Sequence, residues 1–139
     1  MKGFEHLWRL PPVALFLAST DVHVRRAPLD LTDSDIQRLQ CTLSYDEVQR
    51  ARRFYFPRHR RRFTVTRGGL RRILSLYVGM EPKQLRFCYS AYGKPALVST
   101  SSTVRLCFNV SHSHELALYA VTYDRAIGID IEHPRTNFA

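Results

Sequence analysis

Residues 57–79 read PRHRRRFTVTRGGLRRILSLYVG and predict one long helix. Proline is tolerated in the first turn of a helix and glycine often follows the last turn, so Pro57 marks its start and Gly79 its end. Apolar residues at helical spacing predict one buried stripe, made of Phe63, Leu70, Ile73, Leu74 and Tyr77. Arginines are expected to occupy much of the remaining surface, at positions 58, 61, 62, 67, 71 and 72. The pair Gly68-Gly69 lowers the helix propensity in the middle of this helix. Close packing against a neighbour, a closely bound ligand and a tolerated defect are the three alternative reasons for it.

Two shorter helices are expected before this one, each beginning at a side chain that can cap its first turn. The first follows a cap at residue 32 or 33 and ends near Cys41. The second follows Ser44 and ends near Phe54, and Glu47 completes the capping-box pattern.

The rest of the chain has the character of strands and turns. Tyr92-Gly93-Lys94-Pro95 predicts a turn, and residues 99–103 predict a polar loop. Alternating or continuous apolar runs predict strands at residues 21–26, 85–89, 96–98, 104–110, 116–123 and 126–132. Helices followed by strands indicate an α+β fold in which three helices pack on a largely antiparallel sheet.

Composition narrows the class of protein. A chain of 139 residues with 45% hydrophobic residues suits one compact domain and not a disordered chain. No apolar run approaches the roughly 20 residues of a membrane helix. The three cysteines share no motif spacing, which argues against a disulfide framework or a zinc site and favours a reducing compartment; we expect a cytoplasmic protein.

The net charge of +9 comes almost wholly from arginine. Ten arginines lie between Arg50 and Arg72. This concentration predicts an anionic partner, which could be a nucleic acid, a phosphorylated cofactor, an acidic protein or a membrane surface, although a solvated helix face would look the same.

A pair of carboxylates stands in the last predicted strand. Residues two apart on a strand share a face, so Asp130 and Glu132 point the same way. Paired carboxylate oxygens suit a hard cation such as Mg²⁺, which keeps several waters and takes substrate phosphates as further ligands. The alternative is an ordinary polar strand face.

Two further motifs carry groups suited to phosphate. Ser111 and His112 offer hydroxyl, imidazole and backbone donors; a serine nucleophile, a zinc site shared with His114, and a purely structural histidine remain alternatives. In Gly93-Lys94-Pro95 the glycine lets the backbone approach a ligand and the lysine brings a mobile cation, although the motif alone could be merely a turn.

Four motifs in order carry a family resemblance: ARRFYFPRHRRRFTVTRGGLRRIL at 51–74, YGKPAL at 92–97, FNVSHSHELALYAV at 108–121 and IGIDIE at 127–132. Together they resemble the Sfp-type 4′-phosphopantetheinyl transferases, and among them the cyanobacterial HetI-like branch. This family moves the phosphopantetheine arm of coenzyme A to a serine of an acyl or peptidyl carrier protein, with Mg²⁺. Its members are pseudo-dimers of two similar α+β halves, and coenzyme A lies in the cleft between them.

The resemblance implies roles for nine residues. Asp130 and Glu132 would bind Mg²⁺. Coenzyme A would be bound by Arg50 and, as a second candidate, Arg53 at its 3′-phosphate, by Gly93, Lys94 and Pro95 along the adenine and its phosphates, and by Ser111 and His112 at the phosphates. Some relatives carry a lysine where this chain has Glu47, so that contact is not carried over.

The same resemblance implies a division of the chain into an N-terminal extension (1–20), an N-terminal transferase lobe (21–125), and the first strand of a C-terminal lobe with a tail (126–139). The family's W-x-x-K-E-x-x-x-K pattern, which supplies a third metal ligand and the candidate base, does not follow Glu132. We therefore expect no certain catalytic base here and weak or absent transfer by this chain. A separate C-terminal half or self-association would complete it.

Two other classes of function stay open. One is a non-catalytic module that binds coenzyme A or a carrier protein. The other is a nucleic-acid-binding protein, which only the charge favours, because no recognised nucleic-acid motif is present. Our prediction is the transferase, with neither nucleic acid nor membrane as a partner.

Overall fold

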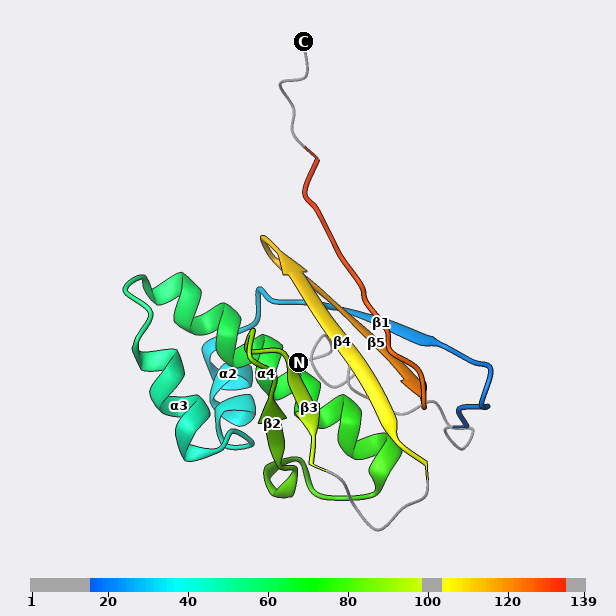
Figure 1. Cartoon of the computed structure of the whole chain (residues 1–139). Coiled ribbons are helices and arrows are strands. Elements are labelled where there is room, and N and C mark those ends of the chain that lie inside the picture. The colour runs from blue at the N-terminus through cyan, green and yellow to red at the C-terminus, as the bar shows by residue number, and fades with distance from the viewer. Residues whose placement is uncertain (1–15, 99–103, 135–139) are drawn as a thin grey trace.

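Helix α4 (Pro57–Val78) forms the middle of a structure, a computed structural model, that describes residues 16–98 and 104–134 (Figure 1). Pro57 occupies its first turn, and Gly79 ends it in the left-handed conformation, with φ at 71°. Val65, Leu70, Ile73 and Leu74 are buried, while Phe63 and Tyr77 are half-buried. The predicted bounds and apolar stripe of this helix are confirmed.

Two capped helices pack on α4. In α2 (Asp33–Gln40) the Thr32 side chain accepts from a first-turn amide, and in α3 (Tyr45–Arg52) Ser44 and Glu47 form the predicted capping box. A Cβ built on Gly68 of α4 would lie 2.8 Å from the Cβ of Leu39 in α2. Close helix packing is therefore the reason for a glycine at position 68.

A three-stranded antiparallel sheet covers the other side of α4, in the order β1 (His23–Pro28), β5 (Leu116–Tyr123), β4 (Leu106–Ser113). A short 3₁₀ helix, η1 (Pro82–Gln84), leads into a separate antiparallel pair, β2 (Phe87–Tyr89) and β3 (Pro95–Leu97). The predicted α+β class with three helices is confirmed.

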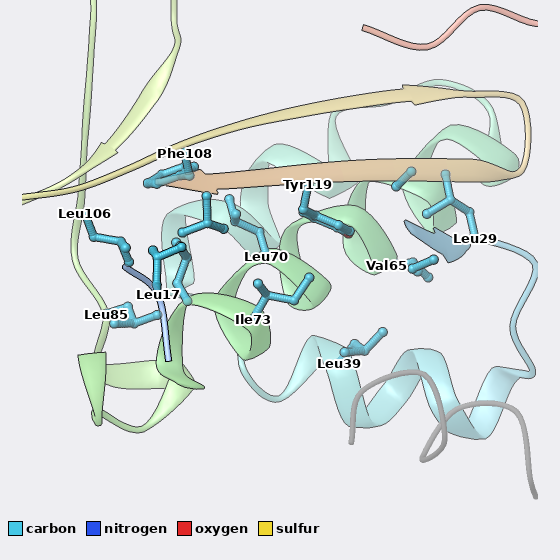
Figure 2. Close-up of a cluster of buried hydrophobic side chains, with 14 of the residues drawn as sticks. Leu17, Leu29, Leu39, Val65, Leu70, Ile73, Leu85, Leu106, Phe108 and Tyr119 are labelled. Atoms are coloured by element: carbon cyan, nitrogen blue, oxygen red, sulfur yellow. The ribbon is translucent and has the colours of Figure 1, made fainter. Parts of the chain in front are cut away.

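The core lies between the sheet and α4. Figure 2 shows Phe108 and Tyr119 of the sheet facing Leu70 and Ile73 of α4, with Leu39 of α2 beyond. Tyr119 is fully buried, and burial raises the pKa of its phenol, so the hydroxyl keeps its proton. That hydroxyl donates to the Thr66 carbonyl oxygen at 2.9 Å and joins the sheet to α4.

Two expectations change in detail. The strand predicted at 104–110 continues to Ser113 as β4, which places Ser111 and His112 on a regular strand. The strand predicted at 126–132 is wrong, because this segment is extended but pairs with no strand among the described residues.

Several predicted features lie partly or wholly outside the described residues, namely most of the N-terminal extension 1–20, the polar loop 99–103 and the end of the tail. Leu17, within the predicted extension, is buried in the core. All three cysteines are free. In the described ranges we find no helix with the length and apolarity needed to span a bilayer.

Candidate functional site

A cleft of about 680 Å³ is lined by α3 and α4 on one side and by the β3 turn and β4 on the other. Four of the predicted site residues line it: Arg50, Gly93, Pro95 and His112. Gly93 has a φ of 80°, so the turn requires a residue that tolerates the left-handed region. The fold thus brings Arg50 and His112, which are 62 positions apart in the chain, to the same cleft.

The cleft is cationic. Arg62 and Arg67 of α4 line it together with Arg50 of α3, and no aspartate or glutamate of the described chain is among its lining residues. The Arg50 guanidinium carbon lies 5.3 Å from the centre of the Phe63 ring, within cation–π range. An anionic group is the ligand that this lining favours. Arg62 and Arg67 were not among the predicted site residues; their place on one helix with Phe63 was the available signal.

His112 faces this cleft from β4 next to the charge of Arg62. His112 is exposed, yet desolvation of its ring, and secondarily the positive charge of Arg62, lower the pKa of His112. At neutral pH the imidazole is therefore mainly uncharged and can donate one hydrogen bond and accept another.

His112 and His114, which the zinc alternative pairs, do not share a strand face. His114 lies in the turn after β4 with a φ of 54°, and its ring centre is 4.1 Å from that of His133. Across residues 16–98 and 104–134, no group of three or more histidine, cysteine, aspartate or glutamate side chains could hold a metal ion. The zinc alternative therefore has no third ligand there.

Behind the cleft lies a buried ion cluster that the sequence reasoning missed. Glu47 is 3% exposed and accepts hydrogen bonds from Arg67 Nη1 at 3.0 Å and Arg71 Nε at 2.6 Å. It also accepts the Ser44 amide at 2.9 Å as part of the capping box. The prediction that Arg67 and Arg71 lie on the solvent surface of the helix is wrong, because both are buried as partners of one carboxylate.

Ser111 lies on the opposite face of β4 from His112, because adjacent strand residues point to opposite sides. Its hydroxyl donates to Asp130 Oδ1 at 3.2 Å and accepts the Ile131 amide at 3.1 Å. The Asn109 side chain accepts the Ile129 amide at 2.9 Å in the same way. The segment 126–134 is thus held beside β4 by side chains instead of a backbone ladder (Figure 1).

Asp130 and Glu132 are both exposed on this segment. Two carboxylates with open surroundings fit Mg²⁺, which needs oxygen ligands and retains waters and substrate oxygens for the remaining positions. The donor set fits such an ion, with one Asp130 oxygen held by Ser111.

Two more predicted residues, besides Ser111, Asp130 and Glu132, stand outside the cleft. Lys94 lines a neighbouring hollow of about 360 Å³ with Gly93 and Pro95, and its Nζ donates to the Ile127 carbonyl oxygen at 3.3 Å. Arg53 is the exposed C-cap of α3 and is not part of the cleft lining. Lys94 therefore links the β3 turn to the start of the segment 126–134.

Residues 30–123 match the family model described as the N-terminal part of 4′-phosphopantetheinyl transferase. The chain is 53% identical to the 4′-phosphopantetheinyl transferase HetI of Nostoc sp., over 94% of this chain and 55% of that protein. It is 30% identical to a 4′-phosphopantetheinyl transferase of Bacillus subtilis, over 76% of this chain and 44% of that protein. The chain thus spans about half the length of these curated relatives.

Proposed function

Because the chain belongs to the 4′-phosphopantetheinyl transferase family, we propose that it serves the transfer of the 4′-phosphopantetheine arm of coenzyme A to a serine of an acyl or peptidyl carrier protein. The observation that carries the proposal is the arginine-lined cleft between α3, α4 and the β3–β4 side of the fold. Coenzyme A has a pyrophosphate and a 3′-phosphate, which suit a site with several guanidinium groups.

Arg50 and Arg62 are the cleft cations that we assign to the phosphates. A guanidinium binds phosphate through two parallel N–H donors, so it fixes position as well as charge. The neutral imidazole of His112 adds a donor on the β4 side, and the Gly93 backbone leaves room for a ligand to approach.

In the proposed reaction the carrier serine oxygen forms a bond to the phosphorus that bears the pantetheine arm. The bond from that phosphorus to the bridging oxygen breaks, adenosine 3′,5′-bisphosphate leaves with the electron pair, and the serine proton passes to a base outside the described residues. Cleft arginines stabilise negative charge that grows on the leaving group. Mg²⁺ bound at Asp130 and Glu132 would supply Lewis-acid stabilisation at the pyrophosphate of coenzyme A.

We assign no general base among the described residues, and we therefore expect weak transfer by this chain alone. A separate C-terminal half or a second copy of the chain is the proposed source of the missing groups. The three free cysteines support a reducing compartment such as the cytoplasm.

The test measures coenzyme A binding by calorimetry with and without Mg²⁺, beside the mass gain of an apo carrier protein. We expect Mg²⁺-assisted binding, weakened by Arg62→Gln. The matched control is Arg52→Gln, which removes an exposed arginine of α3 outside the cleft lining.

Two outcomes would change the assignment. Binding without any transfer, even after a C-terminal half is added, indicates the alternative of a non-catalytic coenzyme A-binding or carrier-binding module. No binding of coenzyme A would contradict the proposal.

A further inference from the structure

Arg67 uses only one edge of its guanidinium inside the protein. Its Nη1 donates to Glu47 Oε2 at 3.0 Å and to the Tyr89 hydroxyl at 2.7 Å. Within the described part of the chain, Nε and Nη2 have no hydrogen-bond partner. The side chain is 10% exposed and lines the cleft. Three N–H donors of a fixed, charged group are therefore left for a group outside the described residues.

The net charge of the buried cluster also favours an anionic ligand at Arg67. Glu47 supplies one negative charge to two arginines, so the cluster carries a net positive charge behind the cleft. Arg71 is 2% exposed, donates to Glu47 and to the carbonyl oxygens of Pro82 and Leu85, and is absent from the cleft lining. Of the three residues of the cluster, Arg67 alone lines the cleft and can bring the excess charge to a ligand there. An uncompensated buried charge is costly unless an anion offsets it.

The surroundings hold this guanidinium in place. Its central carbon lies 5.3 Å from the ring centre of Phe63 and 5.7 Å from those of Phe87 and Tyr89. The preceding residue, Thr66, also lines the cleft, and its Oγ1 is buried with no hydrogen-bond partner among the described residues. An unused hydroxyl and an arginine with an unused edge thus belong to residues that line the same cleft.

We propose that Arg67 binds a phosphate group of the cleft's ligand through its Nε–Nη2 edge, and that buried Glu47 is a positioning residue that holds the opposite edge. The inference rests on the proposed function insofar as the phosphate is one of those of coenzyme A. Arg67 then adds a third anion contact to those of Arg50 and Arg62, at the inner end of the arginine set.

The test compares Arg67→Gln with two controls, using the chain with inorganic pyrophosphate and with coenzyme A as separate probes. Arg71→Gln removes the other partner of Glu47, and Arg58→Gln removes an equal charge from the exposed start of the same helix. We expect Arg67→Gln to raise the Kd for pyrophosphate about tenfold or more, the loss of one charge-assisted contact, while both controls stay within about threefold of wild type. Circular dichroism confirms that each variant is folded at the temperature used.

Two further variants separate positioning from a merely structural role. Arg67→Lys keeps the charge without the fork and should recover part of the affinity. Glu47→Gln leaves Arg67 in place but releases its held edge, and should weaken pyrophosphate binding less than Arg67→Gln does. If Arg71→Gln does not fold, the comparison of wild type, Arg67→Lys and Arg67→Gln takes its place. Pyrophosphate affinity that falls in that order supports the inference, and any other order contradicts it.

Each outcome bears on one claim. Unchanged pyrophosphate affinity in Arg67→Gln, equal losses in Arg67→Gln and Arg58→Gln, or no pyrophosphate binding by wild type would overturn the inference. Pyrophosphate binding that depends on Arg67 without any coenzyme A binding upholds the inference and contradicts the proposed function. Coenzyme A binding that Arg67→Gln leaves unchanged upholds the proposed function and contradicts the inference.

Discussion

Glu47→Gln should destabilise the fold far more than its single lost charge suggests. The carboxylate is 3% exposed and is shared by Arg67, Arg71 and the Ser44 amide. Glutamine keeps the size and one acceptor oxygen, but its amide group is a donor that faces guanidinium donors. Two buried cations then lose their common anion.

The expected loss follows from the burial of the two arginines. Removing one partner of a buried ion pair costs about 3–5 kcal/mol, because the other charge stays desolvated. The Arg67 side chain is 10% exposed beside an open cleft and can recover some hydration, so the lower end applies, about 3 kcal/mol. With an m-value of about 2 kcal/mol/M, the urea midpoint falls by about 1.5 M.

The assay is urea unfolding followed by far-ultraviolet circular dichroism. Asp46→Asn is the matched control, because Asp46 is the exposed neighbour in the same first turn of α3 and its loss should cost about 0.5 kcal/mol. In an Arg67→Gln background the cost of Glu47→Gln should shrink by about 1–3 kcal/mol, since contacting residues couple. A Glu47→Gln protein within about 0.5 kcal/mol of wild type, with an unchanged m-value, would refute the reasoning.

Three more predictions follow from the described contacts. Gly68→Ala should lower the melting temperature, because overpacking against α2 costs about 1–3 kcal/mol and outweighs the gain of about 1 kcal/mol in helix propensity, whereas Gly128→Ala, with nothing within 4 Å of the new Cβ, should not. Proton NMR should give His112 a pKa below its ordinary value, and a normal or raised pKa would contradict the desolvation argument. Because the native state then binds fewer protons than the unfolded chain, the contribution of His112 to stability is present above about pH 6.5 and declines as the pH falls toward the lowered pKa. Replacing Asn109 and Ser111 by alanine together should speed hydrogen exchange at the amides of residues 129 and 131 and leave the core amides of β5 unchanged; equal exchange in wild type and variant would mean that these side chains do not hold the segment.

Local sequence was sufficient for the helices because their ends depend on nearby groups. Pro57, Gly79 and the Ser44–Glu47 box each act within one turn of the residues they cap, so a short window contains the whole interaction. The turn at Gly93 is local in the same sense, since it needs a left-handed residue between two strands that lie next to each other.

The arginines could not be sorted by the same reasoning. Whether an arginine is buried depends on a partner elsewhere in the chain, and Glu47 lies 20 and 24 positions before Arg67 and Arg71. One indication was available, since these two arginines are four residues apart and so share a helix face beside the buried Leu70 and Leu74. The capping-box pattern explains Glu47 as part of a helix end, and it gives no sign that the same carboxylate is also the buried partner of two arginines.

The segment 126–132 shows why alternation alone did not decide strand pairing. Alternating residues make an extended chain, but a strand also needs a backbone neighbour, and here the amides of residues 129 and 131 bond to side chains of Asn109 and Ser111. Those two residues share the face of β4 opposite to His112. The candidate Mg²⁺ ligand Asp130 is thus tied to one face of β4 while the arginine cleft opens on the other. A single ligand that meets both must pass around β4, which a long, flexible molecule with phosphates at separate points can do and a free phosphate ion cannot.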